Sequence, residues 1–262
     1  MYNFEFVKPA SVADAVAALG DEEAQALGGG QTLIPTLKQR LASPSKLVSL
    51  SGIAELKGVK SAGGVLTVGG GTTHATVAAQ AASAYPALAA LAGGIGDPAV
   101  RNRGTVGGSL ANNDPSACYP AGALGSGATI VTNAREIAAD DYFQGMFTTA
   151  LEPGEVITAV KFPIPEKASY QKFMQPASRF ALVGVFVAKF ADGVRVAVTG
   201  ASEEGVFRWA DAEEALNKEF RTDALMDLKV DPAGMIGDLH GTKAYRAHLV
   251  GVMTKRAIAA AA

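Results

Sequence analysis

Residues 27–35 read LGGGQTLIP. Residues 24–27 predict a buried strand, the glycines predict a turn, and 33–41 predicts a helix with Pro35 in its first turn, where proline is tolerated. Successive glycines let backbone N–H groups converge on an anion, and a helix start favours negative charge. Thr32 adds a hydroxyl that can bond a phosphate oxygen. The pattern indicates a phosphate-binding turn, and a plain tight turn is the alternative.

This turn is neither of the two commoner phosphate-binding loops. A Walker A loop requires GxxxxGK followed by Ser or Thr, and no lysine stands at that position. The GxGxxG fingerprint of Rossmann folds is not met either, nor is there a suitably placed ribose-binding acid. A nucleotide site at residues 27–35 therefore needs another architecture.

A second glycine-rich stretch, residues 101–115, reads RNRGTVGGSLANNDP and repeats this chemistry. Glycines open the backbone, and two such loops can clamp a diphosphate from opposite sides. Arg101 and Arg103 add positive charge, and they suit a surface or partner contact equally well. The side chains that can bond phosphate or sugar hydroxyls are Thr105, Ser109, Asn112 and Asp114.

Composition narrows the class of protein. The 262 residues are 48% hydrophobic and 18% charged, and 23 basic against 25 acidic residues leave no electrostatic footprint for nucleic acid. The one cysteine, Cys118, excludes an internal disulfide and an all-cysteine metal site. The three histidines lack metal-ligand spacing. Without a long apolar run or a secretion-signal pattern, we expect a cytoplasmic protein with no membrane span.

The remaining pattern predicts an α+β fold in which Pro163-Ile164-Pro165 is the best domain boundary. Before it we expect strands and helices in alternation: strands at 1–10, 47–50, 56–60, 65–69, 128–131 and 155–162, and helices at 12–19, 74–81 and 86–92, with a turn or short helix at 138–143. Residues 95–120 are expected to form a long functional loop. After the boundary we expect a meander of strands 170–173, 182–190 and 194–202 with a turn at Asp192-Gly193, then helices at 211–216, 222–228 and 243–262.

Together the two glycine-rich loops are a more specific indication of a nucleotide-binding site than either loop alone. The sequence closely resembles the FAD-binding subunit of molybdenum-containing hydroxylases, the family of carbon monoxide dehydrogenase medium chains and the xanthine dehydrogenase flavin domain. The segments that carry this resemblance are GGGQTLIPTLKQRLASPSKLVSL at 28–50, VGGGTTHATVA at 68–78, IGDPAVRNRGTVGGSLANNDPSACYP at 95–120, GEVITAVKFPIP at 154–165, and YQKF with RFALVGVFVA within 170–188. The resemblance implies a PCMH-type FAD-binding domain at 1–165, with lobes of about 1–52 and 53–165, and a C-terminal α+β domain at 166–262.

The resemblance also implies where FAD binds, without a covalent bond. It assigns the pyrophosphate to Gly28–Thr32 and Thr105–Ser109, and the isoalloxazine ring to a contact with Ile95. A charge at Lys172 would stabilise the reduced flavin. The cofactor-binding set implied is Gly28, Gly29, Gly30, Gln31, Thr32, Leu33, Ile95, Thr105, Gly107, Gly108, Ser109, Asn112, Asp114, Cys118, Val156, Ile157 and Lys172, with no catalytic residue and no metal ligand.

Three positions depart from the family pattern. Gln31 stands where histidine or another polar residue is common, Cys118 where an acid is usual, and Arg179 where an acid is frequent. His74 is expected to pack or cap at the start of a helix, and Trp209 to lie in the core or an interface.

The resemblance implies an electron-transfer role within a larger enzyme. A large molybdenum-cofactor subunit would oxidise substrate, a small subunit would carry two 2Fe–2S clusters, and this chain would pass electrons to NAD+, a quinone or another acceptor. The assembly expected is a dimer of heterotrimers. The alternatives are a self-sufficient flavin oxidase or reductase of the same fold, for which no acid–base constellation is found, and a non-catalytic assembly subunit, against which both intact loops argue.

Overall fold

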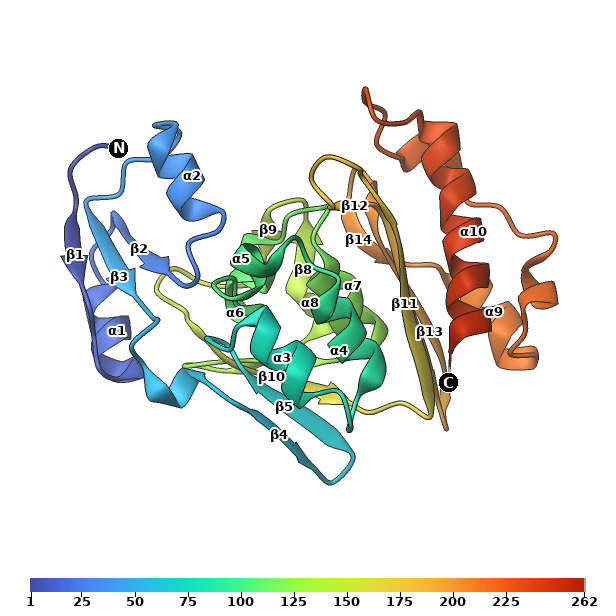
Figure 1. Ribbon diagram of the computed structural model, residues 1–262, viewed down its shortest axis with the longest axis horizontal. Helices are drawn as coiled ribbons and strands as arrows, with labels where there is room; N and C mark the ends of the chain where they lie inside the picture. The colour runs from blue at the N-terminus through green and yellow to red at the C-terminus, as the bar shows by residue number, and fades with distance from the viewer. Residues whose placement is uncertain (262) are drawn as a thin grey trace.

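A computed structural model describes residues 1–261 of the chain. Helices and mostly antiparallel sheets are mixed along it, which confirms the predicted α+β class. Figure 1 shows an N-terminal lobe, a central lobe and a C-terminal sheet side by side, with helix α10 on the side of the molecule away from the N-terminus. No helix in this described range is long and apolar enough to cross a membrane.

The N-terminal lobe is built on a three-stranded parallel sheet. Its strands, in spatial order, are β1 (Glu5–Val7), β3 (Lys46–Ser49) and β2 (Ala24–Leu27). Helix α1 (Val12–Ala18) follows β1, and Ser11 caps it as predicted. Strand β2 lies at a sheet edge and is only partly buried, so the prediction of a buried strand was wrong.

The helix after the glycine turn is shorter than predicted. Helix α2 (Leu33–Lys38) contains Pro35 in its first turn. Arg40 adopts a left-handed φ of +60°, which turns the chain out of the helical path before Leu41. The glycine turn itself connects β2 to α2 as the sequence predicts.

The central lobe holds a five-stranded antiparallel sheet. Its strands, in spatial order, are β4 (Val59–Ala62), β5 (Val65–Gly69), β10 (Ile157–Pro163), β6 (Thr129–Thr132) and β7 (Glu136–Ala138). The predicted strand at 56–60 starts late because Ala54–Leu56 forms the 3-10 turn η1. Helices α3 (His74–Gln80) and α4 (Pro86–Gly93) form where predicted, pack against each other, and bury apolar side chains in the core of the central lobe.

Residues 95–120 are not the irregular loop that the composition predicts. They contain α5 (Pro98–Arg101), α6 (Val106–Asn112) and the start of α7 (Cys118–Gly125). The side chains of Asp97 and Thr105 cap α5 and α6. Glycine has low helix propensity, so the helical state of α6 depends on the burial of its apolar residues rather than on composition.

The C-terminal sheet is a four-stranded antiparallel meander. Its strands are β11 (Lys167–Met174), β12 (Ala181–Phe190), β13 (Gly193–Ser202) and β14 (Gly205–Arg208), of which β14 was not predicted. The β12–β13 turn is at Ala191–Asp192, one residue before the predicted position. Phe186 and Ala197 join the core of the central lobe, whereas Val185 and Trp209 belong to the core on the other side.

Two helices cover the outer face of this meander, α9 (Ala210–Lys218) and α10 (Lys243–Ala260), as Figure 1 shows. The helix predicted at 222–228 is only the 3-10 turn η2 (Thr222–Leu225), and η3 (Pro232–Gly234) follows it. The helix predicted at 243–262 ends at Ala260, and residue 262 lies outside the described residues. A short helix, α8 (Ala139–Tyr142), and an unpredicted hairpin of β8 (Phe143–Gly145) and β9 (Thr148–Thr149) complete the fold.

Candidate functional site

A cavity of about 890 Å³ is lined by residues of all three parts of the fold. This volume lies at the large end of the range for cofactor sites, about 300–1,000 Å³. The lining includes every predicted cofactor-binding residue, although these residues come from six separate segments of the chain: Gly28–Leu33, Ile95, Thr105–Ser109 without Val106, Asn112–Cys118 in part, Val156–Ile157 and Lys172. The residues that were predicted from the sequence to bind the cofactor therefore lie together around one cavity.

The turn between β2 and α2 offers a row of free donors. Within the described chain, none of the backbone N–H groups of residues 28–32 donates a hydrogen bond to protein. Gly30 has a left-handed φ of +72°, a conformation that glycine adopts readily. The side chain of Gln31 folds back to the carbonyl of Gly29, at 3.2 Å, which leaves the donor row open. This geometry fits a phosphate or diphosphate anion.

The second glycine loop does not repeat the first. Its N–H groups are largely used by protein: Val106 donates to Thr72 at 3.1 Å, Gly107 to Gly70 at 2.8 Å, and Gly108 to the hydroxyl of Thr105 at 3.1 Å. A Cβ on Gly107 would lie 2.7 Å from the carbonyl oxygen of Gly70. Here glycine serves close backbone packing within the cavity wall, so the ligand-facing groups of this loop are side chains.

The two arginines of the second motif have different roles. The guanidinium of Arg101 donates to the carbonyls of Ile95 and Gly96, at 2.9 and 3.1 Å, so it braces the turn before α5. Arg103 lines the cavity, and no side-chain partner is found for it in the described residues. A Cβ on Gly29 would collide with the backbone carbonyl of Arg103. The backbone of Arg103 is thus adjacent to the open donor row, and the residue is part of the same cavity lining.

His74 is part of the cavity wall, which the sequence did not predict. It is the first residue of α3, directly after the cap Thr73, as expected. Only 5% of the residue is exposed, and within the described chain Nδ1 has no hydrogen-bond partner. Burial, followed by the charge of Arg101, lowers the pKa of His74 to about 4, so the ring is neutral near pH 7.

The segment before β10 is fixed by polar contacts from the central lobe. The N–H of Val156 donates to the side-chain oxygen of Asn133 at 2.8 Å, and its carbonyl accepts from the N–H of Asn133 at 3.1 Å. Glu155 lies in the lining, and hydrogen bonding to Arg135 is the main cause that lowers the pKa of its carboxyl to about 2. Val156 therefore presents a rigid apolar surface, with its own peptide groups already paired.

Lys172 reaches into the wall from the C-terminal sheet. Its ammonium donates to the carbonyls of Gly94 and Arg179, at 2.7 and 3.0 Å, and lies 3.6 Å from the sulfur of Cys118. Cys118 is buried, with 5% of the residue exposed. The charge of Lys172 is thus inside the cavity wall, but its protons are held by protein acceptors.

The lining also contains residues that the sequence did not single out for the cofactor. Some were in quoted motifs, such as the glycines of 68–71, while others follow only from the packing of the C-terminal sheet. They include Lys57, Gly70, Gly71, His74, Arg103, Gly104, Leu151, Glu155, Ser178, Arg179 and Phe180. Over residues 1–261 there is no group of three or more His, Cys, Asp or Glu that could hold a metal ion.

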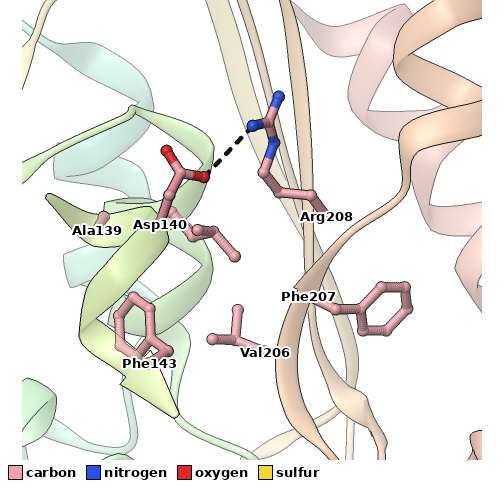
Figure 2. A pocket seen from close by; sticks show the side chains of 7 residues that line it. Ala139, Asp140, Phe143, Val206, Phe207 and Arg208 are labelled. Carbon is pink, nitrogen blue, oxygen red and sulfur yellow. Dashed lines mark hydrogen bonds and ion pairs between the residues drawn. The ribbon is translucent and has the colours of Figure 1, made fainter. Parts of the chain in front are cut away.

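A second hollow, of about 210 Å³, lies between α8 and β14 (Figure 2). Asp140 extends toward Arg208, at 3.3 Å, and forms a tighter pair with Arg195, at 2.7 Å. Arg208 also pairs with Glu213 at 2.6 Å. These ion pairs join the central lobe to the C-terminal sheet. Because the charged groups pair with one another, we assign them a role in holding the fold together rather than in binding a ligand.

Comparison with known proteins supports the assignment of this cavity as a cofactor site. Residues 2–165 match the family described as FAD binding domain in molybdopterin dehydrogenase. The nicotine 6-hydroxylase medium subunit of Paenarthrobacter nicotinovorans is 34% identical over 97% of this chain and 95% of its own. The carbon monoxide dehydrogenase medium chain of Afipia carboxidovorans is 34% identical over 98% and 96%. In the reconstituted CO dehydrogenase from Oligotropha carboxidovorans, a chain 31% identical superposes with a TM-score of 0.89 over 98% of this chain and 97% of that one.

Proposed function

This chain belongs to the family of FAD-binding medium subunits of molybdenum-containing hydroxylases, and on that premise we propose that it is the electron-transfer subunit of a heterotrimeric enzyme. It is an oxidoreductase subunit that acts within a complex, and its cofactor is FAD. The proposed role is to accept electrons from the 2Fe–2S clusters of a partner and to deliver them to NAD+, a quinone or another acceptor. Bound FAD supplies the redox chemistry for this, since a flavin can exchange one or two electrons.

The observation that carries this role is the convergence of the predicted residues on one cavity with an open row of donors. We assign the pyrophosphate to the N–H groups of Gly28–Thr32, with the guanidinium of Arg103 beside them. Ser109, Asn112 and Asp114 are assigned to phosphate and sugar hydroxyls.

The other lining residues complete the proposed site. Ile95, Val156 and Ile157 are proposed to pack against the ring systems, with Cys118 and Lys172 in the same wall. Leu33, Thr105, Gly107 and Gly108 shape the loops. The attachment is proposed to be non-covalent, and Gln31 supports this because it lacks the ring nitrogen through which a histidine at that position could bond the flavin. These residues bind and orient the cofactor, and they exclude water from it.

The partners follow from the same premise. We propose a large subunit with the molybdenum cofactor, a small subunit with 2Fe–2S clusters, and a cytoplasmic dimer of such heterotrimers. The domain division proposed is 1–165 for FAD binding, with lobes of about 1–52 and 53–165, and 166–262 for the C-terminal domain. The curated relatives include medium chains of dehydrogenases with different substrates, so the substrate is assigned to the large subunit rather than to this chain.

Reconstitution and capture test this function. The purified chain is titrated with FAD, and we expect a flavin absorbance that stays with the protein on gel filtration at about one per chain. Capture from its native cell extract should then recover a molybdenum-containing and an iron–sulfur-containing polypeptide. A wild-type chain that retains no flavin contradicts the proposal. Turnover of a reduced substrate by the isolated flavin-loaded chain would instead favour a self-sufficient oxidase.

A further inference from the structure

We propose that Lys172 is a positioning residue that ties together two backbone turns in the wall of the FAD cavity. The first is the central turn, defined as Gly94–Gly96, and the second is the sheet turn, defined as Gln175–Phe180. The central turn carries Ile95, which lines the cavity, and the sheet turn contributes Ser178, Arg179 and Phe180 to the lining. This role rests on the proposed function, and it goes beyond a simple charge near the flavin.

The hydrogen bonds of Lys172 account for its whole ammonium group. An ammonium has three N–H donors and no acceptor. The structure gives this one three protein acceptors: the carbonyl of Gly94 at 2.7 Å, the carbonyl of Arg179 at 3.0 Å and the sulfur of Cys118 at 3.6 Å. No donor of Lys172 is left over for a ligand, so its direct effect falls on the protein backbone.

The central turn depends on charged donors from outside itself. Its three successive carbonyls all accept from cations: Gly94 from Lys172, and both Ile95 and Gly96 from Arg101. The two cations come from different parts of the fold, β11 and α5. Hydrogen bonds to a charged group are stronger than neutral ones, so these three bonds fix the path of the backbone that carries the Ile95 side chain.

The sheet turn closes on itself but needs an anchor to the central lobe. Gln175 donates to the carbonyl of Phe180 at 2.9 Å, and Arg179 donates to the carbonyl of Gln175 at 2.8 Å. Arg179 has a left-handed φ of +62°, an uncommon conformation that persists when surrounding contacts hold it. In the described chain, Lys172 is the only side chain whose hydrogen bonds reach both turns. Its loss should therefore release both at once.

Hydrogen exchange of the full chain, without added FAD, shows whether Lys172 holds the two turns in place or only supplies a positive charge. In Lys172→Met, which keeps the apolar stem, we expect amides of both turns to exchange about tenfold faster, the factor for about 1.4 kcal/mol of lost local stability. Arg101→Met should speed exchange in the central turn only. The matched control is Lys243→Met, because Lys243 likewise donates to protein acceptors, Glu203 and the carbonyl of Ala233, away from the cavity. It should leave both turns unchanged.

A second readout links the tie to the cofactor. After FAD titration, Lys172→Met should bind about tenfold more weakly and shift the visible absorbance of the flavin, while Lys172→Arg, which retains charged donors, should recover part of both losses. If the methionine variant does not fold, Lys172→Gln, with a shorter neutral donor, is expected to loosen both turns in the same way.

Unchanged exchange in both turns of a folded Lys172 variant would overturn the tie, even if the flavin spectrum changed, because that pattern belongs to a free charge. Faster exchange in only one turn would overturn it as well. These outcomes are distinct from failure of the proposed function, in which the wild-type chain itself binds no FAD.

Discussion

Replacing Gly107 by alanine sets two opposing effects against each other. Gly107 lies in α6 and is fully packed against the backbone of Gly70, to which it donates a 2.8 Å hydrogen bond. Alanine is favoured over glycine inside a helix by about 1 kcal/mol. The added Cβ, however, would lie 2.7 Å from the carbonyl oxygen of Gly70 and 3.1 Å from its Cα. Neither atom belongs to a flexible side chain, so the backbone itself must move.

The size of the effect follows from that distance. Ordinary contacts of this kind begin at 3.4 Å, so α6 and Gly70 must separate by about 0.7 Å. Overpacking costs about 1–3 kcal/mol, and the stretched hydrogen bond adds about 1 kcal/mol. After subtraction of the helix gain, we expect a net loss of about 1–3 kcal/mol, which lowers Tm by about 2–10 °C in a chain of this size.

Thermal unfolding and FAD titration measure the two consequences. Because α6 and Gly70 both line the cavity, the displaced wall should also weaken FAD binding about tenfold. The control is Gly251→Ala, a glycine inside α10 with open space at the Cβ position, which gains helix propensity without a clash. It should raise Tm slightly and leave FAD binding unchanged. A Gly107→Ala chain that is stabilised like this control would refute the packing argument.

Three further outcomes are expected. Glu155 has a folded pKa of about 2 against an ordinary 4.5, so its stabilisation is complete above about pH 4.5 and is lost as pH falls towards 2; urea unfolding should show this loss, and Arg135→Met should flatten it. His74 has a folded pKa of about 4 against 6.5, so stability also falls between pH 6.5 and 4; by NMR its ring should titrate near pH 4, and a titration near 6.5 would contradict burial in the wall. Arg246→Met should lower the free energy of unfolding in urea by about 2–4 kcal/mol, because the buried guanidinium donates to the carbonyls of Leu182 and Gly200 and to the carboxylate of Asp238. A change below about 0.5 kcal/mol, as at ordinary surface positions, would contradict this.

Local signals in the sequence were sufficient for most of the elements. Ser11 before an amphipathic run predicted α1, and the Asp192-Gly193 turn signal between two apolar segments predicted the β12–β13 hairpin. These features depend on neighbours within a few residues. The cofactor-binding set that the family resemblance implies also lies in one cavity, although the two glycine loops supply only part of it.

Features that depend on distant contacts were missed. Composition predicted a loop at 95–120, yet α6 is helical because Val106 and Leu110 are buried against the central lobe. Strand β14 follows from pairing with β13, and its four residues carry little pattern of their own.

The role of each individual site residue also could not be predicted from the sequence. No spacing rule shows that Arg101 serves backbone carbonyls while Arg103 faces the cavity, since the two stand in the same motif. The glycines of 105–109 suggested ligand approach, whereas Gly107 meets the backbone of Gly70. Such assignments require knowing how the backbone folds around each side chain, and Gly107 and Gly70 are more than thirty residues apart in the sequence.

The position of β10 in the central sheet has a consequence for synthesis of the chain. Strand β10 separates β5 from β6, and Val160 pairs with Val68 on one side and Ile130 on the other. Until residue 163 has left the ribosome, β5 and β6 each expose an unpaired edge, and such edges invite association with other chains. At about 5–20 residues per second, the roughly ninety residues between β5 and β10 leave that edge open for about 5–20 s. The nascent polypeptide is therefore most exposed to aggregation in this interval, when a chaperone would be of greatest use.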